Sequence, residues 1–161
     1  GAYGYLPNDR RHQIKAYGFM RIKPEVDLGG NLLISTGRPK NCIGNYAGSW
    51  YLNNNKADFP DYGAAYHYCT FNGVAVATPR GSEGTLPTDV RIDLNVVYRP
   101  PMVKGLALRM DVFNVFNRQT AQAIDEVHEV SGDPSTVTPT YGRVISYTAP
   151  RSVRLMATYD F

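Results

Sequence analysis

The two cysteines are the residues of this 161-residue chain whose pairing has the clearest chemical consequence. Cys42 and Cys69 lie in one long polar stretch, and paired thiols in such a stretch favour a disulfide formed in an oxidising compartment. Two unpaired thiols are the alternative. A metal site is less favoured, because only His67 is near in sequence and no CxxC spacing occurs.

Charged residues that alternate with apolar ones are the second candidate for chemistry: Asp89, Arg91, Asp93, Arg109, Asp111 and Arg154. On extended strands, side chains two apart share a face, so these groups would lie together and form a cross-strand ladder of charges. The alternative to this structural role is a functional one, in which the charges contact a ligand or a domain enclosed by the sheet. A glycosidase pair is not supported, because nothing marks Asp89 or Asp93 as an acid of raised pKa.

Recognisable catalytic motifs are absent. The three histidines show no HExxH spacing, no GxSxG or Walker loop occurs, and residues 81–84 lack the lysine of a phosphate cradle. We therefore expect no enzyme activity, no catalytic or cofactor-binding residue and no metal site. A net charge of +3 with acids and bases interspersed argues against nucleic-acid binding.

Strands must position these residues. The 15 glycines, 11 prolines and 12 tyrosines, with only 19% charged residues, predict an all-β fold. Apolar and polar residues alternate in five predicted strands, over residues 10–22, 26–38, 88–99, 106–117 and 151–161. The last one spans roughly 35 Å, enough to cross the hydrocarbon of a bilayer when tilted.

The connections between these strands alternate in length. The turns at 23–25 and 100–105 are short, whereas the predicted loops 39–86 and 118–149 are long, with short pairing expected around 64–69 and 74–77. This asymmetry is typical of an antiparallel transmembrane β-barrel with short periplasmic turns and long extracellular loops. The six alternating charges then face the lumen. No run of 18 apolar residues exists, so no transmembrane helix is expected.

The strand count indicates a piece of a larger barrel. Five strands cannot close, since the smallest membrane barrels have eight. Residues 1–161 are therefore expected to form the C-terminal part of an outer-membrane β-barrel. The chain begins with Gly and carries no signal peptide, which indicates a mature or truncated chain.

Several stretches, in order and covering nearly the whole chain, resemble the C-terminal end of TonB-dependent outer-membrane receptors of the Oar-like branch. They are residues 6–12 (LPNDRRH), 35–39 (STGRP), 79–87 (PRGSEGTLP), 111–117 (DVFNVFN) and 149–151 (APR) leading into 159–161 (YDF). The resemblance implies a 22-stranded, plugged barrel in the bacterial outer membrane. It also implies active uptake of a bulky nutrient such as a peptide or a siderophore.

The resemblance further implies partners. These are the rest of the barrel and its plug, the TonB-ExbB-ExbD complex acting through a more N-terminal part, and outer-membrane lipid and lipopolysaccharide. The aromatic C-terminal strand resembles the signal read by the barrel-assembly machinery, carried here by Val153, Leu155, Tyr159 and Phe161. Pairing of an open strand edge is the physical basis of such recognition.

The sequence is also compatible with two functions other than transport. A soluble β-barrel or sandwich that binds a ligand would fit the length, but its hairpin loops are mostly of two to five residues. An adhesin or surface barrel without transport is the other alternative. The sequence names no substrate and no oligomeric state.

Overall fold

The protein is all-β. A computed structural model describes residues 3–44, 67–130 and 133–161. Within these residues the strands are paired antiparallel in four sheets, with no helix and so none that could cross a membrane. The strands are β1 (Gln13–Lys23), β2 (Val26–Ser35), β3 (Tyr68–Phe71), β4 (Val74–Ala77), β5 (Asp89–Tyr98), β6 (Leu106–Phe113), β7 (Ala121–Ile124), β8 (Glu129–Val130), β9 (Asp133–Val137), β10 (Val144–Tyr147) and β11 (Ser152–Tyr159).

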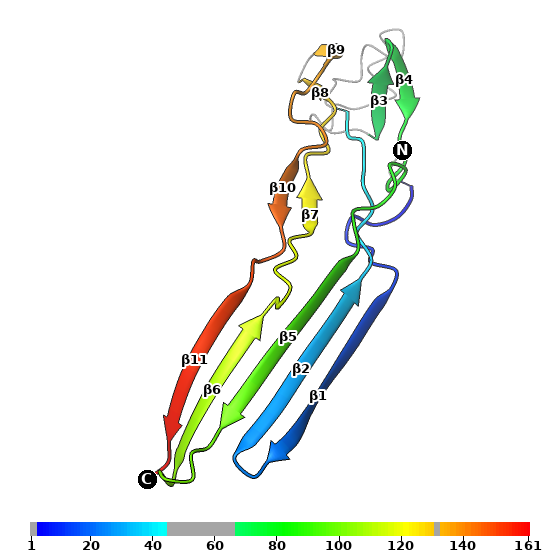
Figure 1. The fold of residues 1–161 in the computed structure, drawn as a ribbon. Coiled ribbons are helices and arrows are strands. Elements are labelled where there is room, and N and C mark those ends of the chain that lie inside the picture. Colours follow the sequence, from blue (N-terminus) through cyan, green and yellow to red (C-terminus); the bar gives the residue numbers. More distant parts are fainter. Residues whose placement is uncertain (1–2, 45–66, 131–132) are drawn as a thin grey trace. The chain divides into compact units, whose positions relative to one another are not determined.

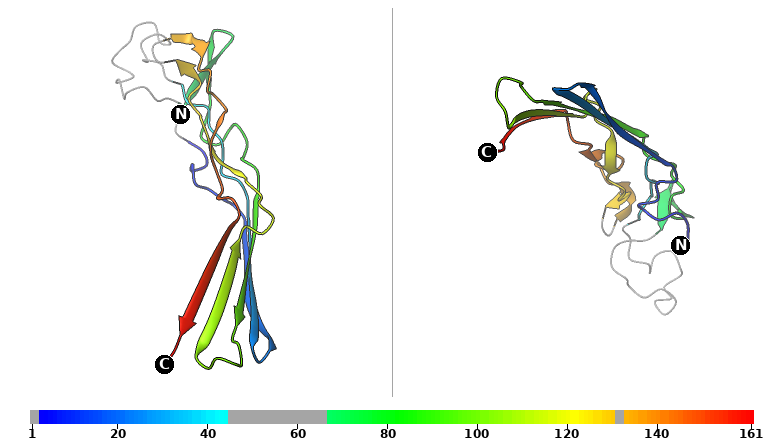
Figure 2. Two further views of the ribbon diagram at one scale, coloured as in Figure 1. Left: turned by 60° about the vertical axis from the view of Figure 1, so that its left-hand side comes forward. Right: turned by 90° about the horizontal axis from the view of Figure 1, so that it is seen from below.

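The chain divides into two compact units, which we call the sheet unit and the loop unit. The sheet unit contains residues 11–36, 88–120 and 148–161, and the loop unit contains residues 1–10, 37–87 and 121–147. The sheet unit is one five-stranded antiparallel sheet in the order β1-β2-β5-β6-β11 (Figures 1 and 2). Among the described residues no strand pairs with the outer edge of β1 or of β11, so the sheet is open.

The five strands of the sheet unit lie within or close to the five predicted segments, and the largest differences at the C-terminal ends are those of β2 and β6. β2 ends at Ser35 rather than at residue 38, and β6 ends at Phe113 rather than at residue 117. The backbone explains the second difference, because Asn114 and Asn117 both adopt positive φ, 51° each, which an extended strand does not allow.

The loop unit contains short strands, including some within residues 118–149, the second of the two predicted long loops. Three two-stranded sheets lie in this unit: β3-β4, β7-β10 and β8-β9. The β3-β4 hairpin turns at Asn72-Gly73, both with positive φ, which is the Asn-Gly signature of a tight hairpin. It matches the short pairing expected in the first loop, although β3 begins at Tyr68, later than predicted.

An apolar core is almost absent from the described residues. Cys42, Cys69 and Leu86 are the buried hydrophobic residues, whereas eleven polar or charged residues are buried. A soluble domain of this length would bury a contiguous set of large apolar side chains. Backbone pairing, ion pairs and the disulfide therefore supply the stabilising contacts of the described residues.

Candidate functional site

One face of the sheet unit is apolar across all five strands. Residues paired across an antiparallel ladder point to the same side, so the register assigns each row to a face. One such row runs Met20–Leu28–Val96–Met110–Leu155, and the next runs Gly18–Gly30–Leu94–Val112–Val153. The remaining rows on this face are also apolar: Ile14–Ile34–Val90, Ala16–Leu32–Ile92, Val26–Tyr98–Leu108–Ala157 and Leu106–Tyr159.

This apolar face is uncovered by the described residues. Leu155 is 75% exposed and Met20 60% exposed, and several further members of the face are exposed as well: Ile14, Ile22, Leu94, Tyr98, Leu108, Met110, Val153 and Tyr159. Contiguous exposed apolar surface of this extent marks a protein or membrane contact in a folded chain.

The opposite face is polar and is organised by ion pairs. Asp111 of β6 accepts hydrogen bonds from Arg109 Nε at 2.7 Å and from Arg154 Nε and Nη2 at 2.9 and 2.8 Å. Asp27 of β2 is held in the same way, by Arg21 Nε at 2.9 Å and Arg99 Nη1 at 2.7 Å. Each carboxylate thus joins neighbouring strands or turns through two guanidinium groups, which is a cross-strand charge ladder.

The six charges singled out in the sequence all lie on this polar face. Asp89 accepts from Arg91 Nη2 at 3.0 Å, and its other carboxylate oxygen is buried without a partner in the described structure. Asp93 accepts a hydrogen bond from the Asn114 backbone N–H at 2.8 Å. Arg109, Asp111 and Arg154 form the triad described above. The register therefore brings these charges together along β5, β6 and β11.

Asn114 closes the end of β6 and was not recognised as a site residue in the sequence. Its side-chain amide donates to the carbonyls of Arg118 and Ala149, at 3.0 and 2.8 Å, and its Oδ1 accepts from the Arg118 N–H at 3.1 Å. Asn117 Oδ1 accepts from the Arg151 N–H at 2.9 Å. The DVFNVFN stretch therefore ties the end of β6 to the start of β11.

In the loop unit, residues 38–44 join the two long connections. On one side they pair with residues 84–86, through Lys40 N–H to the Gly84 carbonyl at 2.8 Å. On the other side they pair with residues 126–128, through Ile43 N–H to the Glu126 carbonyl and His128 N–H to the Ile43 carbonyl, both at 2.8 Å. The connections that follow β2 and β6 are thereby held as one structure.

Glu126 fixes this junction with its side chain. Its Oε1 accepts from Arg38 Nη1 at 2.9 Å and from the Asn41 N–H at 3.0 Å, and its Oε2 accepts from Asn41 Nδ2 at 3.1 Å. Both ionic partners are largely buried, with side chains 13% exposed. A buried carboxylate paired in this way costs stability when one partner is lost.

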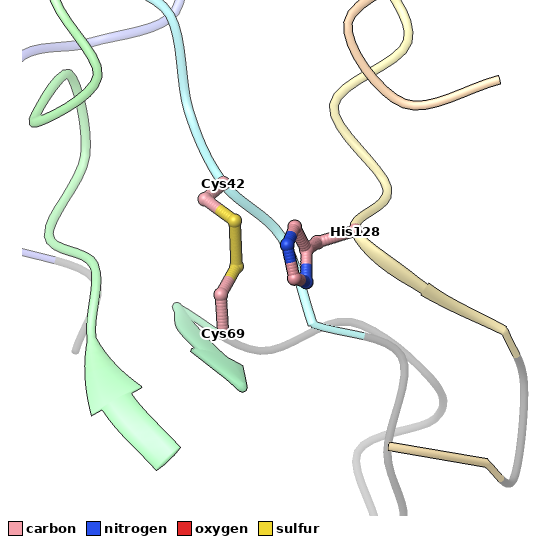
Figure 3. Close-up of side chains that lie close together, drawn as sticks. All are labelled: Cys42, Cys69 and His128. Atoms are coloured by element: carbon pink, nitrogen blue, oxygen red, sulfur yellow. A yellow bond between two sulfur atoms is a disulfide. The ribbon is translucent and has the colours of Figure 1, made fainter. Parts of the chain in front are cut away.

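Cys42 and Cys69 are joined by a disulfide in the loop unit. His128 lies beside it (Figure 3), and the sulfur atoms and a ring nitrogen fall within 4.8 Å of one another. Disulfide sulfurs are not thiolates, and the thiolate is the metal ligand, so this group does not constitute a metal site. The imidazole instead packs against Phe71 and edge-on against Tyr141, with centroids 4.9 and 4.8 Å apart.

Glu129 is buried next to this disulfide and was also missed in the sequence. Its Oε1 accepts from the Thr70 N–H and lies 3.2 Å from His128 Nδ1. Gly44 makes room for it, because a Cβ there would meet the Glu129 carboxylate and the Tyr68 carbonyl. No spacing signal marks Glu126 or Glu129, since their partners lie far away in the chain.

The remaining histidines do not gather into a site. His12 precedes β1 and exchanges hydrogen bonds with Thr36. His67 lies next to Arg80, 3.4 Å from Nε2 to Nε, and burial, followed by the Arg80 charge, lowers the pKa of its imidazole. On β3, Tyr68 and Phe71 are partly exposed.

The terminal strand β11 pairs with β6 in unbroken register, from Ser152–Phe113 to Tyr159–Leu106. Val153, Leu155 and Tyr159 lie on the apolar face and are exposed, and Phe161 follows the end of the strand, fully exposed. Three of the four residues expected to carry an assembly signal therefore lie on an outer strand of the sheet, and the fourth, Phe161, lies just beyond its end.

One known protein is similar to this chain in sequence. The TonB-dependent transporter Oar of Myxococcus xanthus is 26% identical over 193 aligned residues, which include 98% of this chain. This chain resembles a TonB-dependent transporter. The match covers 17% of the relative, so the chain spans about a sixth of that protein's length. No family model and no solved structure matches the chain.

Proposed function

We propose that this chain forms the C-terminal wall of the outer-membrane β-barrel of a TonB-dependent transporter. The observation that carries the proposal is the two-faced sheet: rows of exposed apolar residues on one side and rows of ion pairs on the other. Alternation of this kind suits a wall between lipid and a polar pore. The likeness to the Oar transporter supports the same assignment.

The open edges of the sheet fit a part of a larger barrel. In hydrocarbon every backbone N–H and C=O must be paired, so a sheet can cross a bilayer only within a closed barrel. The outer edges of β1 and β11 would pair with the remaining strands of a 22-stranded barrel. The turns at 24–25 and 100–105 would face the periplasm, and the loop unit would face the exterior.

In this function the chain acts through partners rather than through a catalytic centre. The polar face would contact the plug and the passing nutrient, and the apolar face would contact lipid and lipopolysaccharide. TonB, ExbB and ExbD would act on a more N-terminal part of the protein. The barrel-assembly machinery would read Val153, Leu155, Tyr159 and Phe161 on the open strand β11.

Adjacent residues on β11 provide a matched test. Leu155 lies on the apolar face and Met156 on the polar face. In the full protein, with Trp50 and every other native tryptophan replaced by phenylalanine, Leu155→Trp and Met156→Trp each give a single tryptophan. In vesicles with doxyl-labelled lipids, we expect strong quenching of the Leu155→Trp fluorescence and little quenching of the Met156→Trp fluorescence.

Equal quenching of the two variants would contradict a membrane wall. A protein that remains folded and monomeric in buffer without detergent would support the soluble binding module instead. Transport itself is tested by nutrient uptake in cells that carry the full protein. Intact insertion without TonB-dependent uptake of any nutrient would favour the adhesin or surface barrel.

A further inference from the structure

The polar face of the sheet contains a hollow of about 350 Å³ between β1 and β6. Tyr17 and Phe19 line it on the β1 side and Phe113 on the β6 side, while Asn31, Asp93 and Asn95 lie between them. The ion pair of Arg109 and Asp111 on β6 also lines the hollow. Gly29 makes room for the Asn95 side chain, because a Cβ at that position would lie 2.6 Å from the Asn95 amide nitrogen. The hollow belongs wholly to the sheet unit.

Two aromatic side chains on this face are almost completely exposed. Tyr17 is 88% and Phe19 is 87% exposed, and the register places them in the polar rows with Asn31 and Asn95 rather than on the apolar face. Two residues apart on a strand, their Cα atoms are about 7 Å from each other. They offer two open ring faces to whatever enters the hollow.

Asp93 gives the lining of the hollow a net negative charge, because Arg109 and Asp111, which also line it, pair with each other. Asp27, Asp89 and Asp111 on the described sheet each contact at least one arginine guanidinium. Asp93 accepts only from neutral donors in the described structure, the Asn114 N–H at 2.8 Å and Asn31 Nδ2 at 3.4 Å. A carboxylate beside exposed aromatic rings is the combination that attracts an organic cation.

The planar guanidinium fits this combination better than the ammonium group. It stacks on aromatic faces and donates to a carboxylate in a fork, whereas an ammonium is more strongly hydrated. The row Tyr17–Asn31–Asp93 crosses three strands, about 10 Å at ordinary strand spacing. A side chain could therefore lie along this row, with its guanidinium at Asp93, while Asn31 and Asn95 offer amide groups to a peptide backbone.

We propose that this hollow is a recognition subsite for an arginine side chain of a peptide ligand. The inference deepens the proposed function and rests on it only in placing this face toward the pore. Asp93 pairs with the guanidinium, and Tyr17 and Phe19 stack against the guanidinium plane and the apolar stem of the side chain.

The test uses the longest natural protein that contains this chain, purified in detergent micelles. The probes are acetylated tetra-arginine amide and the matching tetra-citrulline amide, which keeps the side-chain shape but removes its charge. By calorimetric titration we expect the arginine peptide to bind at least tenfold more tightly. Asp93→Asn should abolish most of this preference while retaining an acceptor for the Asn114 N–H.

Matched variants separate charge from structure. Tyr17→Ala and Phe19→Ala should each weaken binding of the arginine peptide about three- to tenfold, and Tyr17→Phe, which keeps the ring, should leave it nearly unchanged. Glu25→Gln removes the same charge from the β1–β2 turn and should not alter binding. Cooperative unfolding by circular dichroism verifies that each variant is folded.

Failure of this inference can be told from failure of the proposed function. Equal binding of both peptides by the unsubstituted protein, or no binding because a basic side chain of the same protein fills the hollow, overturns the inference. Undiminished binding by Asp93→Asn or, if that variant does not fold, by both alanine variants overturns it as well. The lipid-quenching pair at positions 155 and 156 reports on the membrane wall independently.

Discussion

Asn114 shows how one side chain can secure the end of a strand. It is 3% exposed, its backbone has a φ of 51°, and its amide group meets three backbone partners. Asparagine is one of the few residues that tolerate this left-handed conformation and bond to nearby backbone. The same residue type at Asn117 has the same φ but uses only its carbonyl oxygen.

This difference predicts that the same substitution to aspartate will destabilise the protein strongly at position 114 and only slightly at position 117. Asn114→Asp replaces the donor that meets the carbonyls of Arg118 and Ala149 with an acceptor, so we expect a loss of about 2–4 kcal/mol in the free energy of unfolding. Asn117→Asp keeps the acceptor for the Arg151 N–H and should change it by less than about 1 kcal/mol. Urea unfolding in lipid vesicles measures both, and equal effects would refute the assigned roles.

At the scale of elements, the disulfide should stabilise the loop unit alone. Cys42 and Cys69 are 27 residues apart, and a closed loop of this length contributes about 3–4 kcal/mol by the chain-entropy model. The double variant Cys42→Ala and Cys69→Ala should therefore speed hydrogen exchange at Thr70 and His128. Exchange in β5 and β6, in the other unit, is the internal control and should not change. Faster exchange in β5 and β6 would contradict a local role.

The turn after β9 should respond to acid through Asp125. The Thr140 hydroxyl donates to its carboxylate at 2.6 Å, and this bond, with a second from the Val127 N–H, holds the pKa of Asp125 below its usual range. A depressed carboxyl pKa contributes stability above the unfolded value of about 3.9, and this stability is lost as the pH falls through the folded-state pKa.

Pepsin cleavage at Tyr141 between pH 5 and pH 2 would measure this loss. The rate, normalised to an unstructured peptide of residues 136–145, should rise steeply at the acid end. Asp125→Asn cannot titrate, so its normalised rate should stay flat across the same range. A wild-type profile as flat as that of the variant would count against the Asp125 contact as the cause.

The sequence predicts the sheet well because its information is local. A period of two assigns a face to every residue of a strand, and the register places the six charges on the polar face. The strands within the two long connections are harder to predict from the sequence, although the Asn72-Gly73 dipeptide is a clear local signal of a hairpin. Glu126 with Arg38, and Glu129 with Thr70, are contacts 88 and 59 residues apart, and no pattern in one sequence specifies such pairs.

At the scale of the whole molecule, the proposed membrane wall accounts both for the small apolar core of the described residues and for their exposed apolar face. In water a two-faced open sheet with large exposed side chains is unstable toward aggregation, because its apolar rows and its strand edges both seek partners. In the proposed barrel, lipid would cover the rows and neighbouring strands would cover the edges. The disulfide and the buried Arg38–Glu126 ion pair stabilise the loop unit.

Val96 and Val97 test this explanation with two identical side chains on opposite faces of β5. Val96 lies in the apolar row with Met110 and Leu155, and Val97 pairs with Asp27 and Arg109 on the polar face. An arginine on the lipid side of a barrel costs about 2–4 kcal/mol near the bilayer midplane, and a pore-side arginine remains hydrated. Val96→Arg should therefore lower the free energy of unfolding in vesicles by about that amount.

Val97→Arg adds the same side chain to the face where Asp27 lies, so we expect a change of less than about 1 kcal/mol. The two variants differ only in the direction of one side chain. The strand propensity of arginine and the added charge are the same in both, so they cancel in the comparison. Unfolding in urea from vesicles of one lipid composition gives both values. The reverse order, with Val97→Arg the more damaging, would place the lipid on the charged face and refute the assignment of the two faces.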